Sequence, residues 1–159
     1  MLPRTVTRGA LALFVGALVG MQFIPVDRTN PPVTSEIHAS PAVDSILRRA
    51  CYDCHSNETV WPWYSKIAPI SFLVADDVHH GRRHVNFSTW GDYSSAKQIK
   101  TIHEIGEQVR TGEMPLWIYL PMHHDARLSD QDKAAIDAWA KSVGPVPPGA
   151  EGDEHEHEH

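Results

Sequence analysis

The sequence lacks a second pair of cysteines, a strand pattern, an internal repeat and a strong charge of either sign. With only two cysteines in 159 residues, it has no second cysteine pair to complete a structural zinc site. Lys and Arg total 14 against 20 Asp and Glu, and five of these acids lie in the last nine residues. The first 150 residues therefore carry 15 acidic and 14 basic side chains, and no basic stripe indicates nucleic-acid binding.

Both cysteines occur in one pentapeptide, Cys51-Tyr52-Asp53-Cys54-His55. If these residues form a helical turn, Cys51 and Cys54 stand at i and i+3 on one face, and His55 lies beside Cys51 at i+4. C-x-x-C-H is the pattern by which haem c is attached: two thiols bond to the haem and one imidazole ligates its iron. The pentapeptide therefore predicts one covalently bound haem c.

Two other interpretations of the cysteine pair remain open. A redox dithiol or disulfide of the thioredoxin kind belongs near a βαβ pattern, which the sequence does not contain. A zinc site needs three or four Cys or His ligands, and the histidines elsewhere in the chain keep a Cys2His2 site possible. Both interpretations need more than the pentapeptide offers, so haem c is the preferred one.

The N-terminal segment has the pattern of an export signal. Arg4 and Arg8 precede a run from 9 to 24 that is apolar except for Gln22, which matches a basic region followed by a hydrophobic region. The run is shorter than the roughly 20 residues of a comfortable membrane span, and no clear cleavage site follows it. We expect residues 1–25 to be an uncleaved signal anchor that tethers the protein to a bacterial inner membrane. The rest of the chain would then lie in the periplasm, where haem c is attached.

The remaining sequence predicts a proline-rich extended tether at 26–40, an all-α domain at 41–145 and a disordered, acidic, His-rich tail at 146–159. Ser40 and Pro41 begin a helix that leads into the pentapeptide. A second helix follows Pro69, with Ile70, Leu73, Val74 and Val78 inward, and breaks by Gly81. A third spans 95–111 and is closed by Gly112. The last begins at Ser129 with a capping box.

A low-spin electron-transfer haem needs a second iron ligand, and a methionine paired with histidine raises the reduction potential. Met114, in the loop Gly112-Glu113-Met114-Pro115, is the preferred candidate. Met122 or an open position is an alternative, and so is one of the histidines 79, 80, 84, 103, 123 and 124. Three cations are candidates to balance the haem propionates: Arg82, Arg83 and Lys66.

The sequence resembles the bacterial haem-binding domain family, small exported proteins that are built around one C-x-x-C-H and related to cytochrome c. The matching stretches are CYDCHSNETVWPWYSKIAPISFLVADDV at 51–78, GRRHVNFSTW at 81–90, GEMP at 112–115, YLPMHHDARLSDQD at 119–132 and QFIPVDRTNPP at 22–32. The resemblance implies haem c on Cys51 and Cys54, His55 as proximal ligand, a small cytochrome-c-like fold around the haem, and Met114 in the place of a distal methionine.

These features predict a membrane-tethered periplasmic protein that carries single electrons to and from redox partner proteins and has no substrate turnover of its own. One alternative is a haem enzyme or sensor with an open distal site, which acts on peroxide or binds a diatomic gas. A second alternative is a metal-handling protein that uses the histidines of its tail.

Overall fold

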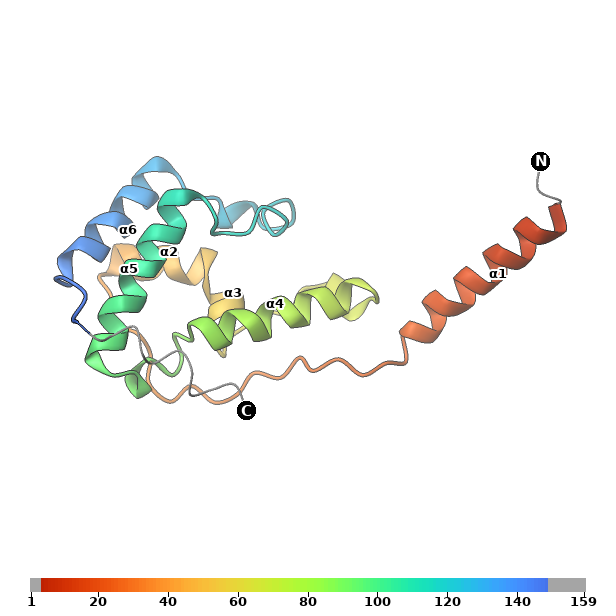
Figure 1. Ribbon diagram of the computed structural model, residues 1–159, viewed down its shortest axis with the longest axis horizontal. Helices are drawn as coiled ribbons and strands as arrows, with labels where there is room; N and C mark the ends of the chain where they lie inside the picture. Colours follow the sequence, from red (N-terminus) through yellow and green to blue (C-terminus); the bar gives the residue numbers. More distant parts are fainter. Residues whose placement is uncertain (1–3, 149–159) are drawn as a thin grey trace.

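The computed structural model describes residues 4–148, with the side chains of 4–7 left out, and its regular structure is helical throughout this range (Figure 1). The α-helices are α1 (Arg4–Met21), α2 (Pro41–Ala50), α3 (Tyr52–His55), α4 (Ile70–His84), α5 (Ser95–Thr111) and α6 (Asp130–Ser142). Short 3-10 helices are η1 (Trp63–Lys66), η2 (Trp90–Asp92) and η3 (His124–Ala126). The all-α class is confirmed, since the described residues contain only an isolated bridge between Ser35 and Thr89.

The helix ends lie where the capping residues predict them. Ser40 accepts a hydrogen bond from the Val43 amide at the start of α2, and Ser129 forms a full capping box with Asp132 at the start of α6. Gly112 ends α5 with φ 78°, a left-handed conformation that glycine adopts at little cost. Each cap is a local interaction, which explains why these boundaries were predictable.

The predicted end of α4 is wrong, and of its four expected inward positions only Val78 is buried. The helix continues past Gly81 to His84, and its buried positions are Ser71, Ala75, Val78 and Gly81. Ile70 and Leu73, which were expected to point inward, are 43% and 57% exposed. Because α4 packs closely on α3, its inner face needs small side chains, and the larger apolar residues lie outside the contact.

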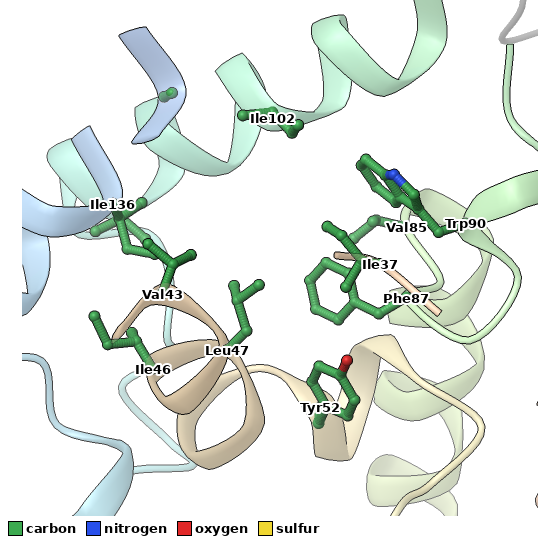
Figure 2. Close-up of a cluster of buried hydrophobic side chains, with 12 residues drawn as sticks. Ile37, Val43, Ile46, Leu47, Tyr52, Val85, Phe87, Trp90, Ile102 and Ile136 are labelled. Carbon is green, nitrogen blue, oxygen red and sulfur yellow. The ribbon is translucent and has the colours of Figure 1, made fainter. Parts of the chain in front are cut away.

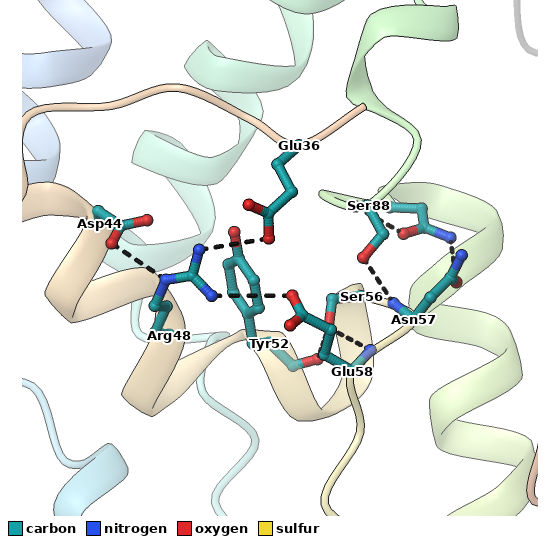
Figure 3. A network of polar contacts seen from close by, with 9 residues as sticks. Glu36, Asp44, Arg48, Tyr52, Ser56, Asn57, Glu58 and Ser88 are labelled. Carbon is teal, nitrogen blue, oxygen red and sulfur yellow. Dashed lines mark hydrogen bonds and ion pairs between the residues drawn. The ribbon is translucent and has the colours of Figure 1, made fainter. Parts of the chain in front are cut away.

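The segment 26–40 is extended, as expected, but the expectation that it does not pack is wrong. The amides of Thr34 and Ser35 donate to the Ser88 carbonyl, at 3.0 and 3.1 Å, and Ile37 is 4% exposed. Glu36 pairs with Arg48 of α2 at 3.3 Å, within the polar network of Figure 3. The folded domain therefore begins before α2.

The hydrophobic core lies between α2, α5, α6 and the segments that flank α3 (Figure 2). Leu47 from α2, Ile136 from α6 and Phe87 are each at most 1% exposed, and Ile102 from α5 is 8% exposed. These side chains hold α5 and α6 against α2, which leads directly into the pentapeptide.

Helix α1 lies at the end of the extended segment, away from the other helices (Figure 1). Just after it, the Gln22 amide group pairs with the backbone of Ala68, donating to the carbonyl at 3.0 Å and accepting from the amide at 3.1 Å. In the part of the chain that the structure describes, no helix has the length and apolar character needed to cross a membrane. Membrane attachment stays a prediction, and the His-rich part of the tail lies outside the described residues.

Candidate functional site

A cavity of about 610 Å³ lies between two walls of the domain. One wall comes from α3 and α4, and the other comes from α5 and the loop that follows it. The four residues predicted for the site, Cys51, Cys54, His55 and Met114, all line this one cavity. Residues that are far apart in the sequence therefore meet where the pentapeptide places its thiols and imidazole.

His55 is held by the backbone of α4. Its Nδ1 lies 2.9 Å from the Gly81 carbonyl oxygen and 3.3 Å from the Val85 carbonyl oxygen. Carbonyl oxygens only accept hydrogen bonds, so Nδ1 must carry the proton, and Nε2 is left as the unprotonated nitrogen. A histidine that ligates a metal is oriented in this way, by donation from its other ring nitrogen to a carbonyl group.

Burial lowers the pKa of His55 below its usual value, and nearby His84 lowers it further, while the two backbone hydrogen bonds act in the opposite direction. The imidazole is therefore neutral at pH 7. Neutral imidazole is the form that binds a metal ion.

The two cysteines are free thiols. Burial raises the pKa of each thiol to about 12, so both are protonated at neutral pH. The zinc interpretation gains no support, because no group of three or more His, Cys, Asp or Glu side chains in the described chain is arranged to hold a metal ion.

Met114 lines the cavity from the wall formed by α5 and its following loop, whereas His55 belongs to the wall formed by α3 and α4. The amides of Glu113 and Met114 donate to the Gln108 carbonyl of α5, at 3.0 and 3.2 Å. The end of α5 therefore fixes the backbone position of Met114. The other candidate methionine, Met122, is 57% exposed and does not line the cavity.

The candidate histidines are distributed unevenly around the cavity. His80 and His84 line it, but both belong to α4, the helix that also supplies the Gly81 acceptor for His55. His79, His103, His123 and His124 are not among the lining residues, and the His103 Nε2 atom contacts the Gly144 carbonyl at 2.7 Å. Of the candidate second ligands in α5 and its following loop, Met114 alone lines the cavity.

The expected propionate partners do not line the cavity. Arg82 donates to the carbonyls of Ser56 and Thr29 and to the side chains of Asn30 and Thr59, at 2.8 to 2.9 Å. Arg83 donates to His80 at 2.9 Å, and Lys66 is exposed. Arg82 therefore connects the extended segment to the turn after α3. Besides the cysteines and His55, the cavity is lined by these ionisable side chains: Asp53, Asp77, His80, His84, Glu104 and Tyr119.

A contact that the sequence did not predict joins the two walls. The Tyr119 hydroxyl donates to Asp53 Oδ2 at 2.6 Å, and both residues line the cavity. Asp53 lies inside the pentapeptide and Tyr119 inside the stretch YLPMHH. Their presence in these two motifs was the only sequence feature that marked them as candidate site residues. Nothing in the spacing of these motifs indicates that the two side chains meet.

The cavity fits a haem group. Its volume lies within the roughly 300–1,000 Å³ of typical cofactor sites, and apolar side chains such as Phe87, Ile105, Leu116 and Leu128 line it beside the thiols, the imidazole and the thioether. A model of the haem-binding domain family matches residues 16–142.

The chain belongs to the haem-binding domain family. The match covers most of the chain, from within α1 to the last residue of α6, and so includes the extended segment that packs on the domain. No curated protein and no solved structure is similar enough to the chain to match it. Family membership therefore supports haem binding by this chain.

Proposed function

We propose that this protein is a membrane-tethered periplasmic one-electron carrier with one covalent haem c, of cytochrome-c-like architecture, and with His55 and Met114 as the iron ligands. The observation that supports the proposal most directly is the single cavity, which collects two free thiols, an imidazole with a free Nε2 and a thioether from another wall.

Cys51 and Cys54 would hold the haem through thioether bonds. In such a bond each S–H would have added across a vinyl C=C bond, with sulfur on one vinyl carbon and the thiol hydrogen on the other. The addition consumes no oxidant. Desolvation raises the pKa of both thiols to about 12, so each would carry the hydrogen that its addition requires.

The iron of the bound haem supplies a one-electron couple. Around it, the chain holds His55 in one tautomer through Gly81, presents Met114 from the end of α5, and lines the space between them with apolar side chains such as Val109 and Leu116. A low dielectric and two strong ligands favour electron transfer over binding of an exogenous molecule.

The proposed location rests on the N-terminal segment. Arg4 and Arg8 precede an apolar run that matches an export signal, and the Gln22 pair with Ala68 joins the end of this region to the domain. The outer side of the bacterial inner membrane is the compartment in which haem c is attached, so the signal and the pentapeptide require the same location.

Spectra of the purified full-length protein test the proposal. We expect low-spin His/Met signals in optical and EPR spectra, high-spin iron in Met114→Ala, and unchanged spectra in the matched control Met122→Ala. Haem should stay with the protein in acidified acetone, and Cys51→Ser with Cys54→Ser should abolish covalent haem. Low-spin signals that persist in Met114→Ala exclude Met114 as ligand, and extractable haem excludes covalent attachment.

The polar side chains of α5 favour one second candidate. Thr101, Glu104 and Gln108 line the cavity on the same wall as Met114, where hydrogen-bonding groups of an open distal pocket would lie. This haem enzyme or sensor would be supported over the electron carrier if the wild-type protein were already five-coordinate. It would then react with peroxide or carbon monoxide as fast as Met114→Ala.

The metal-handling alternative depends on tail residues outside the described structure, and removal of residues 151–159 would test it.

A further inference from the structure

We propose that Tyr119 and Asp53 form a latch that holds the Met114 loop closed over the cavity, which makes Tyr119 a positioning residue for the distal ligand. The inference rests on the proposed function, because it assumes that Met114 is that ligand. It adds the residue pair that determines whether the sixth iron position stays closed.

The Asp53 carboxylate is a fixed acceptor. Its Oδ2 accepts the hydrogen bond from the Tyr119 hydroxyl at 2.6 Å, and its Oδ1 accepts from the Val60 amide at 3.0 Å. The Asp53 carbonyl also accepts from the Thr59 hydroxyl, at 2.7 Å. Both the backbone and the carboxylate of Asp53 are therefore fixed by other hydrogen bonds. If Tyr119 moves away, Asp53 cannot move with it, and the hydrogen bond to the carboxylate breaks.

The loop that carries Tyr119 has few other attachments. The backbone hydrogen bonds of Tyr119, Met122 and His123 stay inside the loop, to the carbonyls of Leu116, Tyr119 and Leu120. In the described chain, residues 115–123 reach other elements by two side-chain hydrogen bonds. These are Tyr119 with Asp53 and a longer contact, 3.4 Å, between His123 and the Tyr64 hydroxyl.

The outward-facing side chains of the loop pack little against the domain. Trp117 is 80% exposed and Ile118 is 59% exposed, so these apolar side chains do not anchor it in the core. On the inner side, the Tyr119 ring stacks on His123 with centroids 3.7 Å apart and planes 9° apart. The stack stiffens the loop itself, whereas the hydroxyl joins the stiffened loop to α3.

The latch spans the cavity from one wall to the other. Tyr119 and Met114 belong to the wall formed by α5 and its following loop, while Asp53 lies between the two thiols on α3. Burial and the Asp53 carboxylate raise the pKa of the Tyr119 hydroxyl, so it stays a donor throughout the physiological range. The segment that presents the distal thioether is therefore hydrogen-bonded to the segment that carries the haem attachment.

Tyr119→Phe in the full-length haem protein removes the hydroxyl and keeps the ring that stacks on His123. The test measures the rate at which the ferrous protein binds carbon monoxide, which requires Met114 to leave the iron. We expect a rate roughly ten- to a hundredfold above wild type, the factor that corresponds to one lost hydrogen bond to a charged group. A high-spin fraction should also appear in the ferric spectrum.

Tyr64→Phe is the matched control, because the Tyr64 hydroxyl contacts His123 and not Asp53. It should bind carbon monoxide within about twofold of wild type, since it loses only a long contact to His123. An equal acceleration in both tyrosine variants would overturn the latch, because it would mean that any loosening of this aromatic cluster suffices.

A double variant separates positioning from a general structural role. If Tyr119 acts through Met114, adding Tyr119→Phe to Met114→Ala should leave the fast carbon monoxide binding of Met114→Ala unchanged. A further acceleration, or a wild-type rate in Tyr119→Phe alone, overturns the latch while the ligand assignment stands. A wild type that binds carbon monoxide as fast as Met114→Ala overturns both the assignment and the latch.

Discussion

Gly81 approaches Cys54 so closely that no side chain fits between them. A Cβ atom built on Gly81 would lie 2.5 Å from the Cys54 carbonyl oxygen and 3.2 Å from the Cys54 Cβ. The carbonyl of the same glycine accepts the hydrogen bond from His55 Nδ1. One residue without a side chain therefore lets α4 reach the pentapeptide and supplies the acceptor that orients its histidine.

Gly81→Ala should push α4 away from α3, because the carbonyl oxygen that the new methyl group meets belongs to the backbone and has little freedom to move. We expect a loss of roughly 1–3 kcal/mol in the free energy of unfolding and a lower ratio of covalent haem to protein. Chemical unfolding and haem quantification check these outcomes.

The control for this substitution is Gly20→Ala in α1, where a Cβ would meet nothing within 4 Å. Since alanine has the higher helix propensity, this variant should be as stable as wild type or slightly more stable, with full haem content. Equal effects at the two positions would contradict the close-contact explanation for Gly81.

Local interactions were predictable from the sequence, and contacts between distant segments were not. The helix starts at Ser40 and Ser129 depend on a few consecutive residues, and the spacing of the pentapeptide is itself local. The inward face of α4 depends on how closely α3 approaches, which periodicity does not encode, so Leu73 was expected to be buried. The pairing of Asp53 with Tyr119 depends on the whole chain path, which only the folded structure reveals.

Arg82 should be more important for stability than its neighbour Arg83. Arg82 donates to four acceptors on the extended segment and the turn after α3, and lysine cannot reproduce that planar fork. Arg82→Lys should lower the free energy of unfolding by roughly 2 kcal/mol and speed proteolysis near Arg28. Arg83→Lys, which loses one contact with His80, should leave both measurements near wild type.

Asp132 should make the stability of the domain depend on pH in the acid range. Hydrogen bonds from the Ser129 hydroxyl and amide, and the nearby Arg49 guanidinium, hold the pKa of Asp132 below its usual 3.8. A carboxyl whose pKa is lower in the folded state binds fewer protons there than in the unfolded chain. Its stabilising effect is therefore full above 3.8 and is lost as the pH falls through the folded pKa.

We expect Asp132→Asn to unfold at a lower temperature than wild type at pH 7, by the few degrees that about 1 kcal/mol of capping corresponds to. The difference should shrink as the pH is lowered below about 4. Asp130→Asn changes the neighbouring acid in the first turn of α6 and leaves the capping box intact, so it should follow the wild-type profile. A difference for Asp132→Asn that stays constant down to pH 3 would contradict the assignment.

Tyr52→Phe should stabilise the protein or leave it unchanged. The Tyr52 side chain is 4% exposed, and its hydroxyl has no hydrogen-bond partner among the described residues, so burying it costs free energy that phenylalanine does not lose. The ring would keep its stacking on Phe87, with centroids 5.3 Å apart (Figure 2). It would also keep the Arg48 guanidinium 4.6 Å from its centroid (Figure 3).

Tyr93→Phe should have the opposite effect on stability, because the Tyr93 hydroxyl accepts a hydrogen bond from the Asn86 amide at 2.9 Å. We expect the free energy of unfolding to rise by up to about 1 kcal/mol in Tyr52→Phe and to fall by about 1 kcal/mol in Tyr93→Phe. Denaturant titrations of the two variants under identical conditions compare them. A fall in both would mean that the Tyr52 hydroxyl is hydrogen-bonded after all, and that its position in the core between Arg48 and Phe87 depends on that bond.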